Sequence, residues 1–251
     1  MRSIAYLGDH VALTTTQLGH KIFVDTDDIV VSPHVLMEGI WEPWIAQFLK
    51  HIIAPGMRVI DVGAHIGWYT LLAAELVGEQ GSVVAYEPNP RLAALLERSI
   101  SVNGFKDRAH VMHAAASSTT GMRLPLFIPK NRSGNARLIE SDSEDAEVVT
   151  VETVRLDEGS DIVGRAVDFI KVDAEGHERR VLLGAEGLLR NPKIALLIEH
   201  HPGGEGARLF EWLQDLGFRS AVVEHDSTLR ELSDVESLRS VPDSEMLYFQ
   251  R

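Results

Sequence analysis

Residues 58–67 read RVIDVGAHIG, in which an apolar run leads directly into a segment with two glycines. Arg58 to Val62 has the pattern of a buried β-strand, and the helical pattern of residues 66–77 follows it. Gly63 and Gly67 let the backbone turn tightly between the two, and they leave main-chain atoms open to a ligand. The stretch therefore predicts the first strand–turn–helix unit of a parallel sheet, with a small-molecule site at its turn.

The chain beyond this stretch repeats the same unit, which indicates an α/β fold. We expect a doubly wound, Rossmann-like, mostly parallel seven-stranded sheet whose last two strands pair antiparallel at one edge. The strands are expected at residues 58–62, 83–86, 110–114, 168–172, 194–198, 219–223 and 246–249. The helices are expected at residues 66–77, 90–102, 177–189 and 206–216.

Two segments depart from this rhythm. Residues 1–57 contain an alternating stretch from Gly19 to Val31 and a helical pattern over residues 35–51, without a flexible linker after them. They are expected to form an N-terminal cap packed on the main domain, residues 58–251. Within that domain, Leu124, Leu126 and Ile128 alternate along the chain and Ser133-Gly134-Asn135 marks a turn, so residues 121–154 are predicted to form an antiparallel β insertion.

Composition excludes several classes of protein. The 251 residues carry 24 Lys and Arg against 37 Asp and Glu, a net charge of −13, so nucleic acid and anionic lipid are not expected as partners. The absence of Cys excludes disulfides and cysteine nucleophiles. No window approaches the ~20 apolar residues that span a bilayer, and no leader pattern precedes the fold, so a cytoplasmic protein is expected. Homo-oligomer formation is left open.

Carboxylates at strand ends indicate the kind of nucleotide that the turn would bind. The loop reads G-x-x-x-G, not the G-x-G-x-x-G that places a pyrophosphate on a helix N-terminus. Asp61 would repel a diphosphate but could bind the ammonium of an amino-acid moiety, and Glu87 could accept hydrogen bonds from both hydroxyls of a ribose. Together with Gly63 and Gly67, these residues favour S-adenosylmethionine as cofactor. The alternative is that the carboxylates only cap helices.

Three runs resemble the FkbM family of S-adenosylmethionine-dependent methyltransferases: residues 59–70 (VIDVGAHIGWYT), 86–90 (YEPNP) and 169–178 (FIKVDAEGHE). Residues 39–42 (GIWE) are similar to a further family motif, and His65 stands where the family usually has Asn. The resemblance implies a class I methyltransferase fold and O-methylation of a sugar or other hydroxylated metabolite in natural-product or polysaccharide pathways. It adds Glu42, Ala64, His65, Pro88 and Asp173 to the candidate cofactor contacts.

Residues after the fourth and fifth strands are candidates for catalysis. Asp173 and the run Glu199-His200-His201 are expected to face the same crevice as the turn, because ligands bind beyond the carboxyl ends of parallel strands. Methyl transfer to an alcohol needs a group that accepts the hydroxyl proton. Asp173 and His200 are the first candidates, with His177 and Glu199 next; the alternative is that the histidines are solvated. Lys171, within a strand, is expected to face elsewhere.

The predicted function is S-adenosylmethionine-dependent O-methylation of a small hydroxylated acceptor such as a sugar or a polyketide. N-methylation of a small amine is the close alternative, followed by a nucleotide-dependent oxidoreductase and a non-catalytic binding module. Asp173, Glu199 and His200 could hold Mg²⁺, but no compact ligand motif is present, so no metal is predicted. Residues 130–135 of the insertion are the candidate segment for acceptor recognition.

Overall fold

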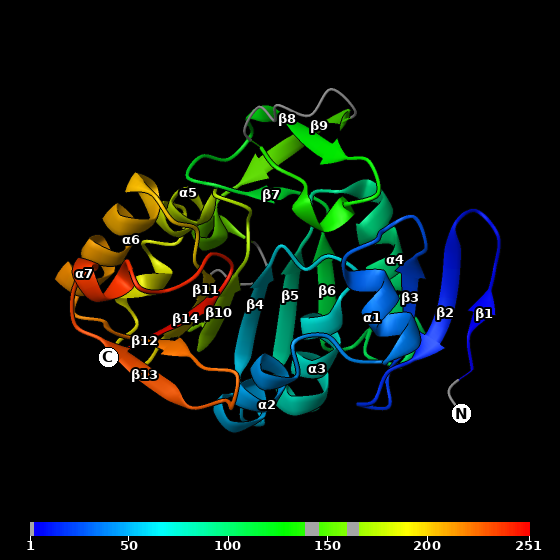
Figure 1. Cartoon of the computed structure of the whole chain (residues 1–251), viewed down its shortest axis with the longest axis horizontal. Coiled ribbons are helices and arrows are strands. Elements are labelled where there is room, and N and C mark those ends of the chain that lie inside the picture. The colour runs from blue at the N-terminus through cyan, green and yellow to red at the C-terminus, as the bar shows by residue number, and fades with distance from the viewer. Residues whose placement is uncertain (1–2, 139–145, 160–165) are drawn as a thin grey trace.

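The central element is an eight-stranded sheet with the order β13-β12-β14-β11-β10-β4-β5-β6 (Figure 1). The structure, a computed structural model, describes residues 3–138, 146–159 and 166–251. Strands β11, β10, β4, β5 and β6 are parallel, and β14, β12 and β13 continue the sheet antiparallel. The strands are β4 (Arg58–Val62), β5 (Ser82–Tyr86), β6 (Ala109–Met112), β10 (Phe169–Val172), β11 (Ala195–Glu199), β12 (Arg219–Val223), β13 (Leu229–Leu232) and β14 (Met246–Gln250).

The seven predicted strands are confirmed, and β13 adds an eighth that the sequence prediction missed. This strand is exposed apart from Leu232, so it lacks the apolar run by which the others are recognised. It pairs with β12 at the edge of the sheet. An antiparallel strand in this position can pack one face on the core and leave the other in solvent.

Two helical layers cover the sheet, and each has its own core. Val59 and Phe169 lie in one core with α2 (Pro43–Ile52), α3 (Trp68–Val77) and α4 (Pro90–Val102). Ile60 and Ile170 point to the opposite core, because successive side chains of a strand alternate between the two faces. That second core is formed with α5 (Glu178–Leu183), α6 (Gly204–Asp215) and α7 (Val235–Leu238).

The N-terminal segment forms a three-stranded antiparallel sheet and two helices. Its elements are β1 (Ala5–Tyr6), β2 (Val11–Thr15), β3 (Lys21–Asp25), α1 (Val31–Met37) and α2. The single helix predicted over residues 35–51 is therefore wrong. Gly39 has a φ of 74° and Glu42 one of 39°, both left-handed, so the chain leaves the helix between them. Pro43 explains the second position, because it disfavours helical conformation in the residue before it.

The stretch predicted as an insertion contains an antiparallel pair, β8 (Arg123–Pro129) and β9 (Ala146–Val154), with the short β7 (Ala115–Ala116) beside β9. Residues 139–145 of the predicted insertion lie outside the described residues. Figure 1 shows the pair above the edge of the sheet at which β4, β5 and β6 end. A short turn, η1 (Ser133–Asn135), follows β8, so the insertion can contribute side chains to any site at this edge.

The helix predicted over residues 177–189 is shorter than expected. It ends at Leu183, and residues 188–190 form a separate turn, η3 (Leu188–Arg190); a further turn, η2 (Leu156–Glu158), precedes β10. Helix α5 is followed by Gly184, whose backbone lies against that of Ser117. A Cβ on Gly184 would lie 2.0 Å from the carbonyl oxygen of Ser117, so only glycine fits at this position. Among the residues described, no helix combines the length and apolar character that crossing a bilayer requires.

Candidate active site

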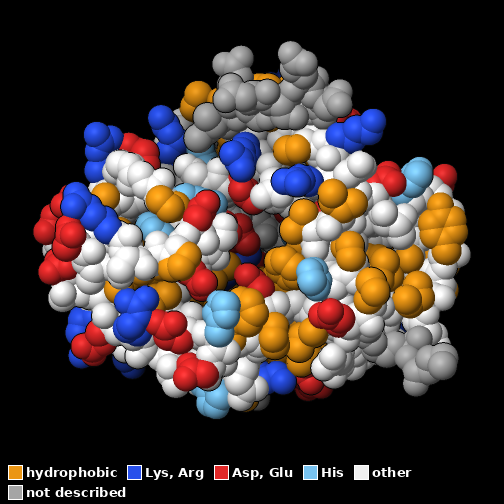
Figure 2. All heavy atoms as spheres, in the orientation of Figure 1, with side chains coloured by type: hydrophobic (Ala, Val, Ile, Leu, Met, Phe, Trp, Pro, Cys, Tyr) orange, Lys and Arg blue, Asp and Glu red, His pale blue; other side chains and the backbone are white. Residues whose placement is uncertain are grey.

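A cavity of about 360 Å³ opens where the parallel strands end, within the range of small-molecule sites. Figure 2 shows a hollow near the centre of this face, with acidic side chains inside it. Seven predicted cofactor contacts line the cavity: Glu42, Gly63, Ala64, His65, Glu87, Pro88 and Asp173. Of the predicted catalytic residues, Asp173, His177 and Glu199 line it.

The turn after β4 is held in shape by Glu87. The backbone N–H of His65 donates to Glu87 Oε2 at 2.7 Å, and that of Asn89 donates to Glu87 Oε1 at 2.8 Å. Each oxygen keeps a further lone pair, so the carboxylate can still accept a hydrogen bond from a ligand in the cavity. Burial raises the pKa of Glu87 to about 7, against the lowering effect of these two backbone donors.

Gly63 is required at the turn by space as well as by conformation. Its φ is 69°, and a Cβ would lie 1.7 Å from the carbonyl oxygen of Asp173, which follows the neighbouring strand. The turn after β4 and the end of β10 therefore touch through backbone atoms. This contact brings Asp173 to the same cavity as the glycine turn.

Lys171 lies inside the site, which corrects the expectation that it would face elsewhere. Its Nζ is 3.1 Å from Asp173 Oδ2, 3.6 Å from Asp61 Oδ1 and 3.3 Å from the carbonyl oxygen of Gly63. Burial opposes the charge, but the two carboxylates outweigh it and raise the pKa of Lys171. Lys171 pairs with Asp61 in the β10–β4 register, and paired residues of neighbouring strands share a face. That register was the signal that could have placed it.

Asp61 does not line the cavity. It is 2% exposed, and its Oδ2 accepts a hydrogen bond of 2.6 Å from the Thr70 hydroxyl while Oδ1 faces Lys171. Gly67 likewise lies outside the cavity lining, with a φ of 92° and with Leu96 packed where a Cβ would be. Both residues support the turn from behind, outside the lining of the cavity.

Glu42 and Tyr69 form a buried pair at the side of the cavity. The Tyr69 hydroxyl donates a short hydrogen bond to Glu42 Oε2. Burial raises the pKa of Glu42 to about 7, and burial together with the nearby carboxylate raises that of Tyr69. The backbone at Glu42 is left-handed, and the side chain of this residue of the N-terminal segment reaches Tyr69 of the main domain.

Asp173 and Glu199 meet across the ends of β10 and β11. Carboxylate oxygens of these two residues and of Glu175 lie within 4.8 Å of one another. Burial opposes ionisation of Asp173, but Lys171 prevails and lowers its pKa. Burial and the charge of Asp173 raise the pKa of Glu199 to about 9. One carboxylate is therefore held charged, and its neighbour binds a proton much more tightly.

The histidines are arranged differently from the sequence prediction. His201, not His200, lies on the side of Glu199, with its Nε2 2.9 Å from Glu199 Oε2. His200 and His201 both line a second cavity of about 280 Å³ beside α6, and neither is among the residues that line the first. His177 lines the first cavity, but its Nε2 is 3.0 Å from the Ser117 hydroxyl and burial lowers its pKa to about 4.

His201 was missed because only one histidine of the adjacent pair was expected to face the cleft, and His200 was ranked first. Side chains two residues apart point the same way in an extended chain, so Glu199 and His201 share a side. Glu199 was itself a candidate, and His201 lies two residues after it. The alternation of side chains along an extended chain could therefore have identified His201.

The insertion closes the cavity opposite the strands. Ser133, Gly134 and Asn135 line it, and His65 Nε2 is 3.4 Å from the Ser133 hydroxyl. The Asn135 amide donates to Glu175 Oε1 at 3.1 Å. The side chain of His65 thus contacts the insertion. This contact is a structural role for the histidine that stands at this position.

These groups fit S-adenosylmethionine. The glycine turn leaves backbone atoms open, Glu87 offers carboxylate oxygens inside the cavity, and acidic side chains suit a cofactor with a net positive charge. Glu87, Glu42 and the backbone of residues 63–65 would hold it. When bound, the cofactor supplies a methyl group that is electrophilic because it is attached to a sulfonium.

Comparison with known proteins agrees with this geometry. The family described as Methyltransferase FkbM domain matches residues 61–220. A methyltransferase of Sordaria araneosa, sdnD, is 26% identical over 196 residues, which cover 64% of this chain and 73% of the relative. The protein-L-isoaspartate O-methyltransferase of Korarchaeum cryptofilum is 35% identical over 75 residues, and the match covers only 27% of this chain and 34% of that protein.

Solved structures show the same fold. The FkbM methyltransferase of Methylobacillus flagellatus KT aligns with a TM-score of 0.50 at 17% identity, over 81% of this chain and 50% of that one. Fibrillarin of Aeropyrum pernix, solved with S-adenosylmethionine bound, aligns with a TM-score of 0.51 at 16% identity, over 99% and 100% of the two chains. Since the family match spans more than half of its residues, the chain belongs to the FkbM family of S-adenosylmethionine-dependent methyltransferases.

Proposed function

We propose that the protein transfers a methyl group from S-adenosylmethionine to a hydroxyl of a small acceptor. The observation that carries this proposal is the position of Asp173 and Glu199, which line the same cavity as the glycine turn and Glu87. A hydroxyl oxygen placed between the carboxylates and the methyl carbon would have a proton acceptor on one side and its electrophile on the other.

The electrostatics support a carboxylate as the proton acceptor. Glu199, whose pKa is raised to about 9 by burial, is a strong base when it is ionised. Asp173 stays ionised beside Lys171 and favours proton uptake by its neighbour. His177 is a weak candidate, because burial lowers its pKa to about 4, and His200 faces another cavity.

The cofactor contacts that we propose are Glu42, Gly63, Ala64, His65, Glu87, Pro88 and Asp173, which all line the cavity. Asp61 acts through Lys171, and Gly67 acts through the shape of the turn. These assignments leave the part of the cavity below the insertion for the acceptor.

We propose a sugar or a polyketide alcohol as the acceptor. Trp41 lines the cavity and offers an aromatic face, while Asn135 and Ser133 offer hydrogen-bonding groups from the insertion. The net charge of −13 disfavours a nucleic-acid substrate. The matches to relatives named for tRNA or for isoaspartate cover at most 27% of this chain. The acceptors of those relatives are therefore not evidence for the acceptor of this protein.

The test is a screen with S-adenosylmethionine labelled in its methyl group, against methyl glycosides, polyketide alcohols and the corresponding amino compounds. We expect methylation of at least one hydroxyl compound, a loss of about a hundredfold or more in Asp173→Asn, and no loss in the exposed variant Asp226→Asn. Methylation of the amines alone would favour the N-methyltransferase alternative and contradict the proposal.

A further inference from the structure

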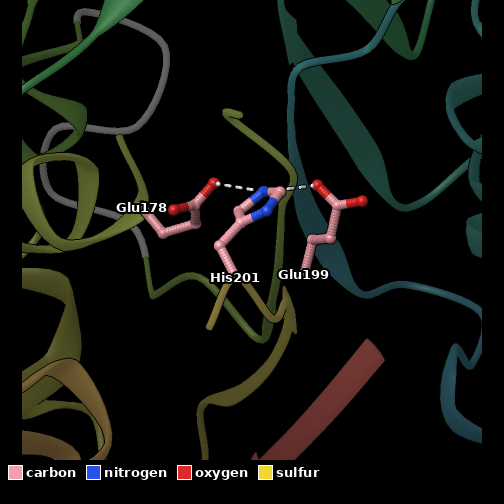
Figure 3. A group of neighbouring side chains, drawn as sticks. All are labelled: Glu178, Glu199 and His201. Carbon is pink, nitrogen blue, oxygen red and sulfur yellow. Dashed lines mark ion pairs between the residues drawn. The ribbon is translucent and has the colours of Figure 1, made fainter. Parts of the chain in front are cut away.

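We propose that His201 carries the acceptor's proton from Glu199 to solvent. The inference rests on the proposed function, because it assumes that Glu199 takes a proton from a hydroxyl. Figure 3 shows the His201 ring between the carboxylates of Glu178 and Glu199, which come from different elements. His201 is therefore a positioning and proton-transfer residue behind the cavity, not a residue that touches the acceptor.

The ring connects a buried carboxylate to an exposed one. Its Nε2 is 2.9 Å from Glu199 Oε2, in a side chain that is 12% exposed. Its Nδ1 is 3.2 Å from Asp243 Oδ1, in a side chain that is 65% exposed. Histidine suits this place because it can bind a proton on one ring nitrogen and release one from the other.

The backbone holds this arrangement in place. The N–H of His200 donates to the carbonyl oxygen of Glu245, and the N–H of Ser244 donates to the carbonyl oxygen of His200, both at 2.8 Å. These bonds fasten the segment after β11 to the loop before β14, which carries Asp243. Glu178 Oε1, 3.6 Å from Nε2, borders the ring on its other side.

Proton release completes the chemistry of methyl transfer. The acceptor's O–H bond breaks as its oxygen bonds to the methyl carbon, and the electron pair of the carbon–sulfur bond goes to the sulfur. The step uses the form of the pair in which Glu199 is ionised and His201 is neutral, which is the minor form at pH 7 because the pKa of each is raised to about 9. In this form the proton passes to Glu199 and then to Nε2 of the ring. The doubly protonated ring gives its Nδ1 proton to Asp243 or to water, so one proton per turnover reaches solvent. Proton exchange with solvent then returns the ring to its Nδ1–H tautomer and restores the starting state.

The charged and titratable groups around the ring support its role. The ion pair with Glu199 is the main reason why the pKa of His201 rises to about 9. The groups that face the pair are the acidic Asp173, Glu175, Glu178 and Asp243 and the basic Lys171 and His200. Because most are acidic, they help the ring to take up the proton that leaves Glu199.

The first measurement needs no acceptor. We would titrate the protein, labelled with ¹⁵N-histidine and saturated with S-adenosylhomocysteine, by NMR. The expected result is one imidazole that titrates well above the usual value, disappears in His201→Gln and shifts downward in Glu199→Gln. The matched control is His113→Gln, which breaks a surface pair with Glu97 whose Nε2–Oε1 distance is 3.1 Å. An unshifted His201 imidazole, insensitive to Glu199→Gln, would overturn the proposal.

The second measurement uses the hydroxyl compound with the highest turnover in the screen above. His201→Gln should lower kcat about tenfold or more at pH 7 with KM little changed, and the loss should shrink toward high pH, where hydroxide can take the proton. Asp243→Asn should give a smaller loss, and His113→Gln none. Wild-type kcat and pH profile in a folded His201→Gln would contradict the inference, whereas failure of the wild type on every hydroxyl would contradict the proposed function.

A chelator separates this role from the other chemistry open to these side chains. Glu178, Glu199 and His201 offer ligand atoms within 4.8 Å of one another, close enough for one divalent cation. Proton transfer predicts equal rates with and without EDTA. A rate lost in EDTA and restored by Mn²⁺ or Mg²⁺ would overturn the proposal in favour of a metal site.

Discussion

The Lys171 ammonium lies between two carboxylates, and almost no solvent reaches it. It is 3% exposed, and Asp61 and Asp173 lie within 3.6 Å of its Nζ. Removing one partner of a buried ionic group leaves the remaining charges without compensation. The free energy lost in this way is larger than the net contribution of the intact pair to stability. The charge of this residue thus supports both the strand pairing behind the site and the ionised state of Asp173.

Lys171→Met should therefore destabilise the protein strongly. We expect a loss of about 3–5 kcal/mol in the free energy of unfolding, measured by urea denaturation at pH 7. Lys193→Met, which removes an exposed lysine, should change it by less than about 0.5 kcal/mol. Equal stability of the two variants would mean that the buried charges do not depend on Lys171.

Glu87 should make stability fall with rising pH. Its pKa is about 7 in the folded chain and about 4.3 when exposed, so the folded state holds the proton more tightly. The stability that it contributes is complete below pH ~4.3 and is lost as pH rises through 7, by about 3 kcal/mol. Glu42 and Glu175 act in the same direction.

The measurement is urea denaturation of the unliganded protein between pH 5 and pH 8.5. Glu87→Gln should flatten the decline by about 3 kcal/mol, and the exposed variant Glu211→Gln should follow the wild type. A decline of the same size in Glu87→Gln would show that Glu87 titrates normally.

Single residues were predictable where their position follows from topology. Asp173, Glu199 and Glu87 end parallel strands, so the expectation that they share an edge needed only the strand pattern. Lys171 and His201 depend on which face a side chain takes, which requires the register between strands and the path of the chain after β11. Asp61 shows the same limit, because it precedes the turn yet lies behind Lys171 and outside the lining of the cavity.

At the scale of elements, the unit β4–turn–α3 depends on contact between two backbones. Gly63→Ala should be far more damaging than glycine replacement elsewhere, because its Cβ would overlap a main-chain oxygen of Asp173 at 1.7 Å. Gly121→Ala is the matched control, since Gly121 has a φ of 81° and no atom within 4 Å of a built Cβ.

We expect Gly121→Ala to cost about 1–2 kcal/mol for the left-handed backbone alone. Gly63→Ala should cost at least about 2 kcal/mol more, because a backbone must move. Thermal and urea unfolding of the two variants give the comparison. Similar losses would show that the turn can widen without moving the end of β10.

The predictability of an element follows from the strength of its end signals. Helix α4 has the predicted bounds, because Asn89 caps it, Pro90 begins it and Asn103-Gly104 follows it. The break between α1 and α2 was missed because the apolar spacing of residues 35–51 continues across it. Pro43 and Gly39 carried the information, but a helical period outweighed them in the prediction.

At the scale of the whole molecule, the N-terminal segment shares its core with the main domain. Ile45 and Leu49 of α2 are buried in the same cluster as Leu72 of α3. Strand β3 is joined to α4 through the Arg91–Asp25 ion pair, whose Nε–Oδ2 distance is 2.8 Å. These contacts support our proposal that residues 1–57 are a cap on one folding unit.

A fragment of residues 58–251 should therefore not fold as a cooperative unit. The fragment lacks α2, so one side of α3 would be exposed to solvent. It also lacks Glu42, which lines the cavity. Circular dichroism and urea denaturation of the fragment should show no sharp transition, whereas the full chain should unfold in one. A fragment with cooperative unfolding would show that the cap is an independent addition.

The central claim is that S-adenosylmethionine binds in the cavity formed by the glycine turn and Glu87. The most direct test is isothermal titration of the full chain with S-adenosylhomocysteine, beside Glu87→Ala and the exposed variant Glu211→Ala. We predict saturable binding to one site per chain, weakened about tenfold or more in Glu87→Ala and unchanged in Glu211→Ala. No binding to the folded wild type, or equal binding to Glu87→Ala, would contradict the account.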